Sequence, residues 1–340
     1  MRSTPLVSVL LPVFNAASTV ARAVQSIRQQ TRADWEIIAV DDGSTDGTRE
    51  LLAALTRQET RLRLLARPHA GIVTALNAGL AEARGRLIAR MDADDEAHGE
   101  RFARQVAFLN QRPDVGVAGS LVEFGGDRTQ AGGYALHVDW MNGLIEPEDI
   151  ALNRFVESPF AHPSVMFRRE LVERHGGYRD GDFPEDYELW LRWLDAGIRM
   201  AKVPRVLLTW HDAPARLSRT EARYDTEAFY RCKAVYLAHW LRRHVPPSRR
   251  VLVWGAGRPT RKRAEHLVAQ GVTLAGYLDI DPRKQGRQFS GRPVIAPKEL
   301  PSAEEVFVLG YVAKRGAREL ARACLRAHGF AEGRDFLMAA

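Results

Sequence analysis

Cysteine and long apolar runs are what this sequence has least of. Its 340 residues include two cysteines, Cys232 and Cys324, which lie far apart and do not form the spacing of a zinc site. Two distant thiols agree with a reducing compartment and argue against a disulfide framework. No basic segment followed by an apolar stretch opens the chain, and no apolar run is long enough to cross a bilayer. We therefore expect an intracellular protein without disulfides or zinc.

Internal repeats and low-complexity tracts are missing as well. What is present is ordinary for a globular protein, with 45% hydrophobic and 27% charged residues, and the length suits two domains with a core each. The formal net charge is +7 at pH 7. A basic balance favours anionic partners such as nucleotides, phospholipid surfaces or acidic polymers, without choosing among them.

The first ninety residues alternate between apolar runs and helical patterns. The runs predict strands at 7–14, 35–40, 62–66 and 85–89, with helices between them. This alternation predicts an α/β fold, with a mostly parallel sheet flanked by helices. Ligands of such sheets bind at the carboxyl ends of the strands, so the polar loops that follow the runs form the candidate site.

Carboxylates follow the fourth predicted strand, in the sequence RMDADD at 90–95. In an extended segment alternate side chains point the same way, so Asp92 and Asp94 can aim at one point. Their repulsion must be offset, and oxygen ligands favour a hard cation, Mg²⁺ or Mn²⁺. The alternative is a solvated acidic turn that caps the next helix, which suits Asp95 and Glu96.

A second pair of acids, Asp41 and Asp42, follows the second predicted strand. A carboxylate there can accept hydrogen bonds from a ribose hydroxyl or a base N–H, and Gly43 lets a ligand approach the backbone. For Asp46, a little further on, we favour a helix-capping role.

Four motifs, in this order and spacing, resemble the family 2 glycosyltransferases: PVFN at 12–15, VDDGSTDGT at 40–48, Gly71 with NAG at 77–79, and ARMDADD at 89–95. The resemblance implies an inverting enzyme with the nucleotide-sugar-binding A fold. It implies a nucleoside-diphosphate sugar as donor, with UDP expected, and Mn²⁺ or Mg²⁺ on the diphosphate at Asp94, with Asp92 nearby. The substrate-binding residues that it implies in this part of the chain are Pro12, Phe14, Asn15, Asp41, Asp42, Gly71, Asn77, Arg90 and Asp92.

Two candidate substrate-binding residues, Arg90 and His162, keep an alternative. Arg90 either adds a positive charge beside the diphosphate or pairs structurally with Asp92. His162, in FAHPSVMFRR at 160–169, is expected in an extended segment. It either contacts the donor sugar or the acceptor, or it is a satisfied structural residue.

The segment 210–219 occupies the place of a family loop that often closes over the diphosphate. Many relatives carry an arginine where this chain has Trp210 or His211, which puts the phosphate role of His211 in doubt. Arg216 or Arg219 could substitute, or these residues could be surface charges only.

The general base is expected in PEDYELW at 184–190, where a loop becomes an amphipathic helix. An inverting transferase needs one carboxylate to take the proton of the acceptor hydroxyl while that oxygen attacks the anomeric carbon. The resemblance gives this role to the pair Glu185 and Asp186, and by position to Asp186. The alternative is that both acids only favour the positive amino end of the helix.

The segment between the acid cluster and the base predicts a helix at 98–110, a strand at 115–124 and a strand pair at 198–210. A polar loop is expected from 125 to about 139. It forms either a wall of the acceptor site or a plain surface excursion.

The last hundred residues predict a separate module. A long helical pattern at 224–244 ends at VPPS, and we place the domains at 1–219 (catalytic), 220–247 (helical linker) and 248–340 (Rossmann-like, role unknown). WGAG at 254–257 and Asp279 after the next strand resemble half of a Rossmann fold, but Thr260 replaces the third glycine, so dinucleotide binding is weakly supported. Only about three strands are expected in total, through 306–309 and 335–338.

The domain boundary carries a basic cluster, composed of Arg242, Arg243, Arg249, Arg250, Arg261, Lys262 and Arg263. It is either a solvated basic face, which we favour, or a peripheral contact with an anionic membrane face, where lipid-linked acceptors lie.

The sequence as a whole predicts a cytoplasmic glycosyltransferase, with or without peripheral contact at the inner face of the cell membrane. Its acceptor is expected to be a hydroxyl of a glycan or of a lipid-linked molecule, with no nucleic-acid partner, and a homodimer stays open. The alternatives are a sugar nucleotidyltransferase, an NAD-dependent oxidoreductase and a non-enzymatic nucleotide-sugar binding protein. Against the first, a nucleotidyltransferase uses a glycine-rich loop after the first strand, where this chain has PVFN.

Overall fold

The computed structural model describes residues 4–212, 217–314 and 316–340. They divide into two compact units. The N-terminal unit comprises Met1–Ile150, Pro159–Gly181 and Ala196–Thr220, and the C-terminal unit comprises Ala151–Ser158, Asp182–Asp195 and Glu221–Ala340. Two short segments of the expected catalytic domain therefore pack with the C-terminal unit. The predicted domain boundaries at 219 and 247 stay a prediction.

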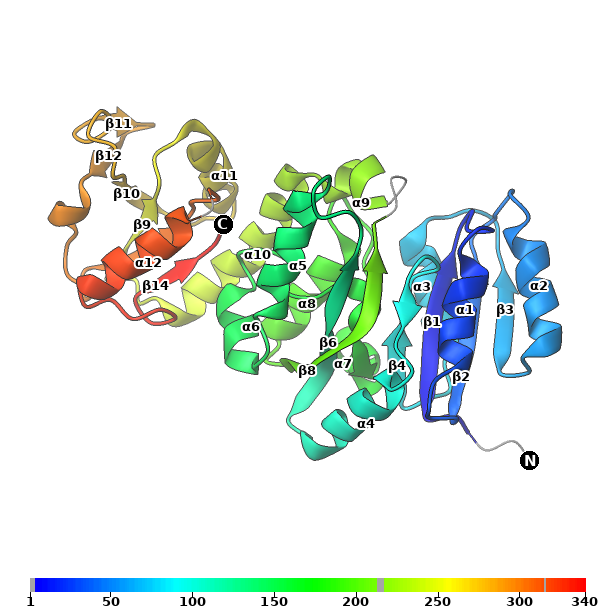
Figure 1. The fold of residues 1–340 in the computed structure, drawn as a ribbon. Coiled ribbons are helices and arrows are strands. Elements are labelled where there is room, and N and C mark those ends of the chain that lie inside the picture. Colours follow the sequence, from blue (N-terminus) through cyan, green and yellow to red (C-terminus); the bar gives the residue numbers. More distant parts are fainter. Residues whose placement is uncertain (1–3, 213–216, 315) are drawn as a thin grey trace. The chain divides into compact units, whose positions relative to one another are not determined.

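An eight-stranded sheet forms the centre of the N-terminal unit, in the order β3-β2-β1-β4-β7-β6-β8-β5 (Figure 1). The first four strands in this order are parallel, β7 is antiparallel to both of its neighbours, and β6 and β8 pair in parallel. The strands are β1 (Val7–Val13), β2 (Trp35–Asp41), β3 (Leu62–Ala66), β4 (Leu87–Arg90), β5 (Glu96–Ala97), β6 (Val115–Gly125), β7 (Met166–Arg168) and β8 (Arg199–His211). The predicted mostly parallel α/β sheet is confirmed.

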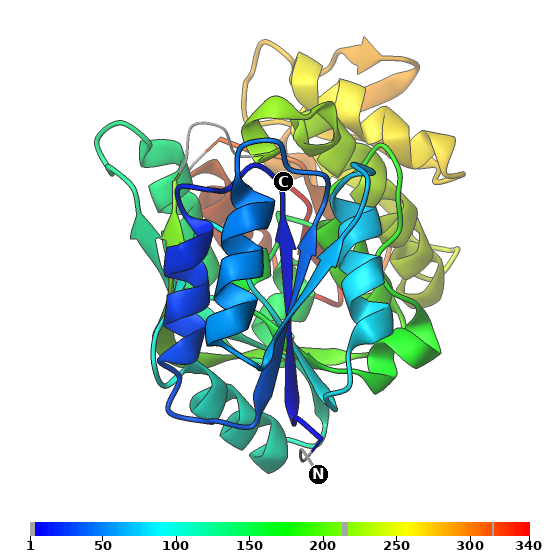
Figure 2. The same ribbon diagram turned by 90° about the vertical axis from the view of Figure 1, so that its right-hand side faces the viewer.

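Helices cover both faces of this sheet, which explains why the strands are continuous apolar runs. In β1, Val9 and Leu11 pack in one cluster with α1 and α2, whereas Leu10 lies against Gly79 of α3 on the other face. Figure 2 shows α1 and α2 on one side of these strands and α3 on the other. The helices are α1 (Val20–Arg28), α2 (Thr48–Gln58), α3 (Ile72–Glu82), α4 (Arg101–Gln111), α5 (Gly132–Asn142), α6 (Pro147–Asn153), α7 (Glu170–His175) and α9 (Leu217–Thr220).

Three expectations for the middle of the chain were wrong. The polar loop expected from 125 to 139 contains most of α5, because Ala135, Val138 and Met141 have helical spacing and are buried. The strand pair expected at 198–210 is the single strand β8. Its pairing with β6 shifts register around Pro204, but the chain does not turn back there, so both parts of β8 run parallel to β6. His162 lies in a 3-10 turn, η1 (His162–Ser164), and not in an extended segment.

The C-terminal unit contains a six-stranded sheet, in the order β11-β12-β10-β9-β13-β14, parallel except for β11. Its strands are β9 (Arg250–Trp254), β10 (Leu274–Leu278), β11 (Gln288–Phe289), β12 (Arg292–Ile295), β13 (Val306–Gly310) and β14 (Phe336–Met338). Its helices are α8 (Glu185–Asp195), α10 (Thr226–His244), α11 (Arg258–Ala269) and α12 (Ala317–Ala327), with 3-10 turns η2 (Ala222–Tyr224) and η3 (Pro297–Glu299).

The count of about three strands for this module was therefore too low. The missed hairpin joins β11 to β12 through Ser290 and Gly291, both with positive φ, and its strands are too short to show a clear alternation. Within the described ranges, no helix is long and apolar enough to cross a membrane.

Candidate active site

Three carboxylates gather where β4 ends. Asp92, Asp94 and Asp95 each offer an oxygen within 4.8 Å of the others. Asp92 and Asp94 are partly exposed and Asp95 is buried. Converging carboxylate oxygens open to solvent on one side are the donor set that Mg²⁺ and Mn²⁺ prefer, so these residues fit the expected ion.

Two buried arginines lie beside this acid cluster. Arg90, only 1% exposed, donates from Nη2 to Asp92 Oδ1 at 2.6 Å and also donates to the carbonyl of Met91. Arg101 of α4 is fully buried and donates to the carbonyl of Arg90 at 2.7 Å. Burial lowers the pKa of Arg101 to about 9, although the charge of Asp95 opposes that shift. The structural pairing of Arg90 with Asp92, one of its two alternatives, is thus present.

His211 reaches the acid cluster from the end of β8. Its backbone N–H donates to Asp95 Oδ1 at 2.8 Å, and its Nε2 lies 2.9 Å from Glu96 Oε1. The antiparallel pairing of β5 with β8 produces this approach. Arg219 pairs with Asp212 at 2.6 Å, and Arg216 lies outside the described residues.

The two acids after β2 are committed to neighbouring loops. Asp41 is buried and binds Arg49 Nε at 2.7 Å. Asp42 accepts the backbone N–H groups of Ala70 and Gly71, both at 2.9 Å, and lies 2.9 Å from His69 Nδ1. Asp42 therefore fixes the loop that starts α3 beside the loop that follows β2.

An aromatic pair stands next to these loops. Phe14 is 44% exposed and stacks on His69, with ring centroids 4.2 Å apart and an angle of 23° between the planes. Asn15 adopts a positive φ of 47°, and its Oδ1 accepts the Thr45 N–H at 2.9 Å. Pro12 lies within β1 and pairs with Val40. His69 was not among the site residues predicted from the sequence. Its position directly before Ala70 and the motif residue Gly71 could have indicated it.

Asn77 and His162, both expected to bind substrate, meet in a buried network. Asn77 holds the backbone of Tyr178, accepting its N–H at 3.0 Å and donating to its carbonyl at 2.9 Å. The Tyr178 hydroxyl lies 2.8 Å from His162 Nε2. Burial, with a smaller effect of the Arg90 charge, lowers the pKa of His162 well below its ordinary value. His162 is therefore a neutral residue of the core near Arg90.

Glu185 and Asp186 begin α8 in the C-terminal unit, whereas the other predicted site residues belong to the N-terminal unit. Glu185 is 2% exposed and accepts the Tyr224 hydroxyl at 2.7 Å. Asp186 is partly exposed, and its Oδ1 accepts the Tyr187 N–H at 2.7 Å.

The Rossmann-like loops of the C-terminal unit satisfy one another. Asp279 accepts the Ala256 N–H at 2.8 Å and binds Lys284 Nζ at 2.9 Å. Thr260, in the place of the third glycine, donates to the carbonyl of Tyr311 at 3.0 Å. The Asp279 carboxylate, the Ala256 N–H and the Thr260 hydroxyl are thus engaged within the protein.

The basic cluster predicted near the domain boundary is largely paired. Five of its seven members form ion pairs: Arg243 with Asp195, Arg249 with Asp335, Arg250 with Glu305, and both Lys262 and Arg263 with Glu227. Pairing reduces the charge that this surface offers to an anionic membrane.

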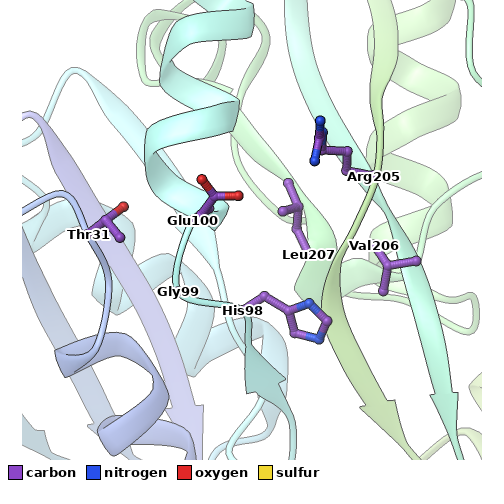
Figure 3. A pocket seen from close by; sticks show the side chains of 7 residues that line it. All are labelled: Thr31, His98, Gly99, Glu100, Arg205, Val206 and Leu207. Carbon is purple, nitrogen blue, oxygen red and sulfur yellow. The ribbon is translucent and has the colours of Figure 1, made fainter.

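A cavity of about 360 Å³ opens elsewhere on the N-terminal unit (Figure 3). It is lined by Thr31, His98, Gly99, Glu100, Arg205, Val206 and Leu207. None of the predicted site residues lines it, so it does not belong to the acid cluster or to the aromatic pair.

Comparison with known proteins gives a consistent result. Residues 8–176 match the model of the family described as Glycosyl transferase family 2. The chain is 32% identical over 210 residues to the amylovoran biosynthesis glycosyltransferase AmsE of Erwinia amylovora, covering 59% of this chain and 74% of that one. It is 25% identical over 250 residues to the O-antigen biosynthesis glycosyltransferase WbnJ of Escherichia coli, covering 72% and 92%.

The fold also resembles a solved structure. The crystal structure of S. aureus TarS 1–349 in complex with UDP-GlcNAc superposes with a TM-score of 0.55 at 19% identity, over 69% of this chain and 66% of that one. A longer TarS structure gives 0.53, with 39% of its length covered. At this identity the likeness concerns the fold alone.

Proposed function

Since the chain belongs to glycosyl transferase family 2, we propose that it transfers a sugar from a nucleoside-diphosphate sugar, with inversion at the anomeric carbon. It is a glycosyltransferase, and the proposed donor is a UDP-sugar, the class of ligand held by TarS. The proposed acceptor is a hydroxyl of a glycan or lipid-linked molecule, in keeping with the polysaccharide-building roles named for AmsE and WbnJ.

The acid cluster after β4 is the observation that carries this proposal. Asp94 and Asp92 would hold Mn²⁺ or Mg²⁺, which supplies positive charge for the diphosphate as it leaves. Because Arg90 is buried and bound to Asp92, we propose that it orients this carboxylate. The buried Arg101 donates a hydrogen bond to the carbonyl of Arg90 and so helps to fix the backbone directly before the acid cluster.

The nucleoside is proposed to bind over the loops after β1 and β2. The stacked rings of Phe14 and His69 give a flat surface on which a base can stack. Asp42 is proposed to contact the uracil or ribose, sharing its oxygens with the loop at 69–71. Asp41, Asn15 and Gly71 shape this site in the proposal, because their contacts with Arg49, Thr45 and Asp42 fix the loops. Pro12 and Asn77 stay predicted substrate-binding residues.

Asp186 is proposed as the general base. Its carboxylate takes the proton of the acceptor hydroxyl while that oxygen attacks the anomeric carbon from the face opposite the diphosphate. A carboxylate at the first turn of a helix is stabilised in its charged form, which suits a group that must be ionised before it accepts a proton.

Asp186→Asn tests the assignment directly. We expect sugar transfer to fall at least a thousandfold, whereas the dissociation constant of UDP with Mn²⁺ changes less than twofold, because an amide cannot accept the proton but fills the same volume. Transfer is measured by release of UDP from a panel of UDP-sugars, and affinity by calorimetry. A parallel loss of UDP affinity would remove Asp186 from this role. Failure of the wild-type protein to bind UDP with any divalent metal would refute the proposed function.

A further inference from the structure

Helix α8, which carries Glu185 and Asp186, runs beside α10 within the C-terminal unit. Contacts join α8 to α10 and to the turn η2 directly before it, and the partners advance together along both segments, so the two helices run in the same direction. In order, these contacts are Tyr224 Oη to Glu185 Oε2 at 2.7 Å, Tyr187 to Phe229 with ring centroids at 5.3 Å, Tyr236 Oη to Glu188 Oε1 at 2.5 Å, and Arg243 Nη1 to Asp195 Oδ1 at 2.8 Å.

The first of these contacts fixes the acid pair. The carboxylate of Glu185 is buried, and a buried carboxylate stays charged only with a strong hydrogen-bond donor beside it. The Tyr224 hydroxyl is such a donor, at 2.7 Å from Glu185 Oε2. Burial, and then the charges of Glu185 and Asp186, raise the pKa of Tyr224, so its hydroxyl stays protonated and donates. The charges of both Glu185 and Asp186 thus act on the Tyr224 hydroxyl.

Helix α10 is in turn fixed to the Rossmann-like sheet. Glu227 near its start binds Lys262 and Arg263 of α11. Further along, Tyr230 packs on Tyr311, at 5.8 Å between centroids, and Trp240 on Phe307 of β13, at 5.6 Å. The sheet, α11, α10 and α8 therefore form a continuous packed chain of elements that ends at the acid pair.

We propose that the Rossmann-like module is a scaffold for the acid pair, with Tyr224 as the positioning residue that holds Glu185 and so places Asp186. This role rests on the proposed function of Asp186 as the base. It also agrees with the contacts of Asp279 and Thr260 in this module, since Asp279 binds the Ala256 N–H and Lys284, and Thr260 binds the carbonyl of Tyr311.

The test uses the full-length chain with Tyr224→Phe, which removes one hydroxyl and keeps the ring. Tyr277→Phe is the matched control, because Tyr277 is a buried tyrosine of the same unit whose hydroxyl contacts Arg292 and not α8. For each variant we measure hydrogen exchange of the amides of 188–191, the affinity for UDP with Mn²⁺, and kcat and KM with a UDP-sugar.

For Tyr224→Phe we expect faster exchange at 188–191 and a kcat lower by about tenfold to a hundredfold, the range for losing a hydrogen bond to a charged group. KM for the donor and the affinity for UDP should change less than twofold, and Tyr277→Phe should match wild type in all four measurements. Unchanged exchange overturns the proposal whatever the activity. Faster exchange with unchanged kcat, or a kcat loss matched by loss of UDP affinity, overturns it too.

The exchange measurement needs no substrate, so it separates this proposal from the proposed function. If wild-type protein neither binds UDP nor turns over a UDP-sugar, the transferase assignment fails, and the exchange result still decides whether Tyr224 holds the acid pair.

Discussion

The chain builds two largely parallel sheets and treats the carboxyl ends of their strands in opposite ways. In the N-terminal unit the loops after β1 and β4 leave Phe14 and the carboxylates of Asp92 and Asp94 partly open to solvent. In the C-terminal unit the loops after β9 and β10 turn their polar groups on one another, and Asp279 is buried between Ala256 and Lys284. Similar strand arrangements thus yield one edge with partly exposed polar groups and one edge whose loops bind each other, so the loops and not the sheet set what each edge can bind.

The largest expected effect comes from removing a carboxylate from the open edge. Asp94→Asn should weaken UDP binding in the presence of Mn²⁺ by about a hundredfold or more, since an amide oxygen is a far weaker ligand for a hard cation. Calorimetry with UDP, with Mn²⁺ and with EDTA, measures this loss. If Asp94→Asn and wild type bind UDP equally well with Mn²⁺, Asp94 does not hold the metal, and the proposed contrast between the two edges is wrong.

One arginine from each unit, Arg101 and Arg249, provides the next comparison. Arg101→Met removes a buried guanidinium that donates hydrogen bonds to the carbonyls of Arg90 and Val165. The substitution should lower the free energy of unfolding by about 2–4 kcal/mol and weaken metal-dependent UDP binding. Arg249→Met removes a mostly buried arginine directly before β9 in the C-terminal unit, where it binds Asp335 and the carbonyl of Val306. It should cost similar stability and leave UDP binding unchanged, as urea unfolding and calorimetry can show.

A smaller effect is expected at the closed edge. Asp279→Asn weakens the hydrogen bond to Ala256 N and removes the charge that faces Lys284, which should lower the free energy of unfolding by about 1–2 kcal/mol. UDP affinity should stay within twofold of wild type, and NAD should stabilise neither protein in thermal unfolding. Stabilisation of wild type by NAD, lost in Asp279→Asn, would mean that this edge also binds a ligand.

The two units should behave alike in one respect, the titration of a buried lysine. Burial lowers the pKa of Lys202 in the N-terminal unit and of Lys233 in the C-terminal unit from 10.5 to about 7. Between pH 7 and 10 the unfolded chain therefore binds more protons, and each lysine should raise the stability with pH by about 1 kcal/mol per pH unit. Lys202→Met and Lys233→Met should each flatten this rise in urea unfolding at pH 7, 8 and 9. A slope equal to that of wild type would show that the lysine titrates normally.

Strands buried on both faces were the part of the fold that the sequence predicts best. The runs at β1, β2 and β4 are buried at nearly every position, and those at β2 and β4 lead into acids. Helix α5 was missed because its apolar residues are masked by Gly132, Gly133 and Asp139, and its burial against β6 depends on packing that no local pattern reports. The hairpin of β11 and β12 was missed because strands of two and four residues are too short to show an alternation.

The candidate site divides in the same way. The acid cluster could be predicted, because Asp92, Asp94 and Asp95 are close in sequence and follow one strand. The partners of the other residues could not, because they come from distant segments. His69 stacks on Phe14, and Tyr178 joins Asn77 to His162 across about a hundred positions of chain. Such contacts depend on the tertiary fold, which brings together residues that are far apart in the sequence.

The contact between Tyr224 and Glu185 has a consequence for how the protein matures during synthesis. A chain is made from its N-terminus, and domains fold as units once their residues have emerged. The strands that carry the acid cluster are complete by residue 220, but α8 lacks its partner until α10 is made, and α10 lacks its support until β13 has left the ribosome. The nascent protein should therefore complete the unit with the acid cluster first and the support of Asp186 last, so that, if Asp186 is the base as proposed, an unfinished chain transfers no sugar.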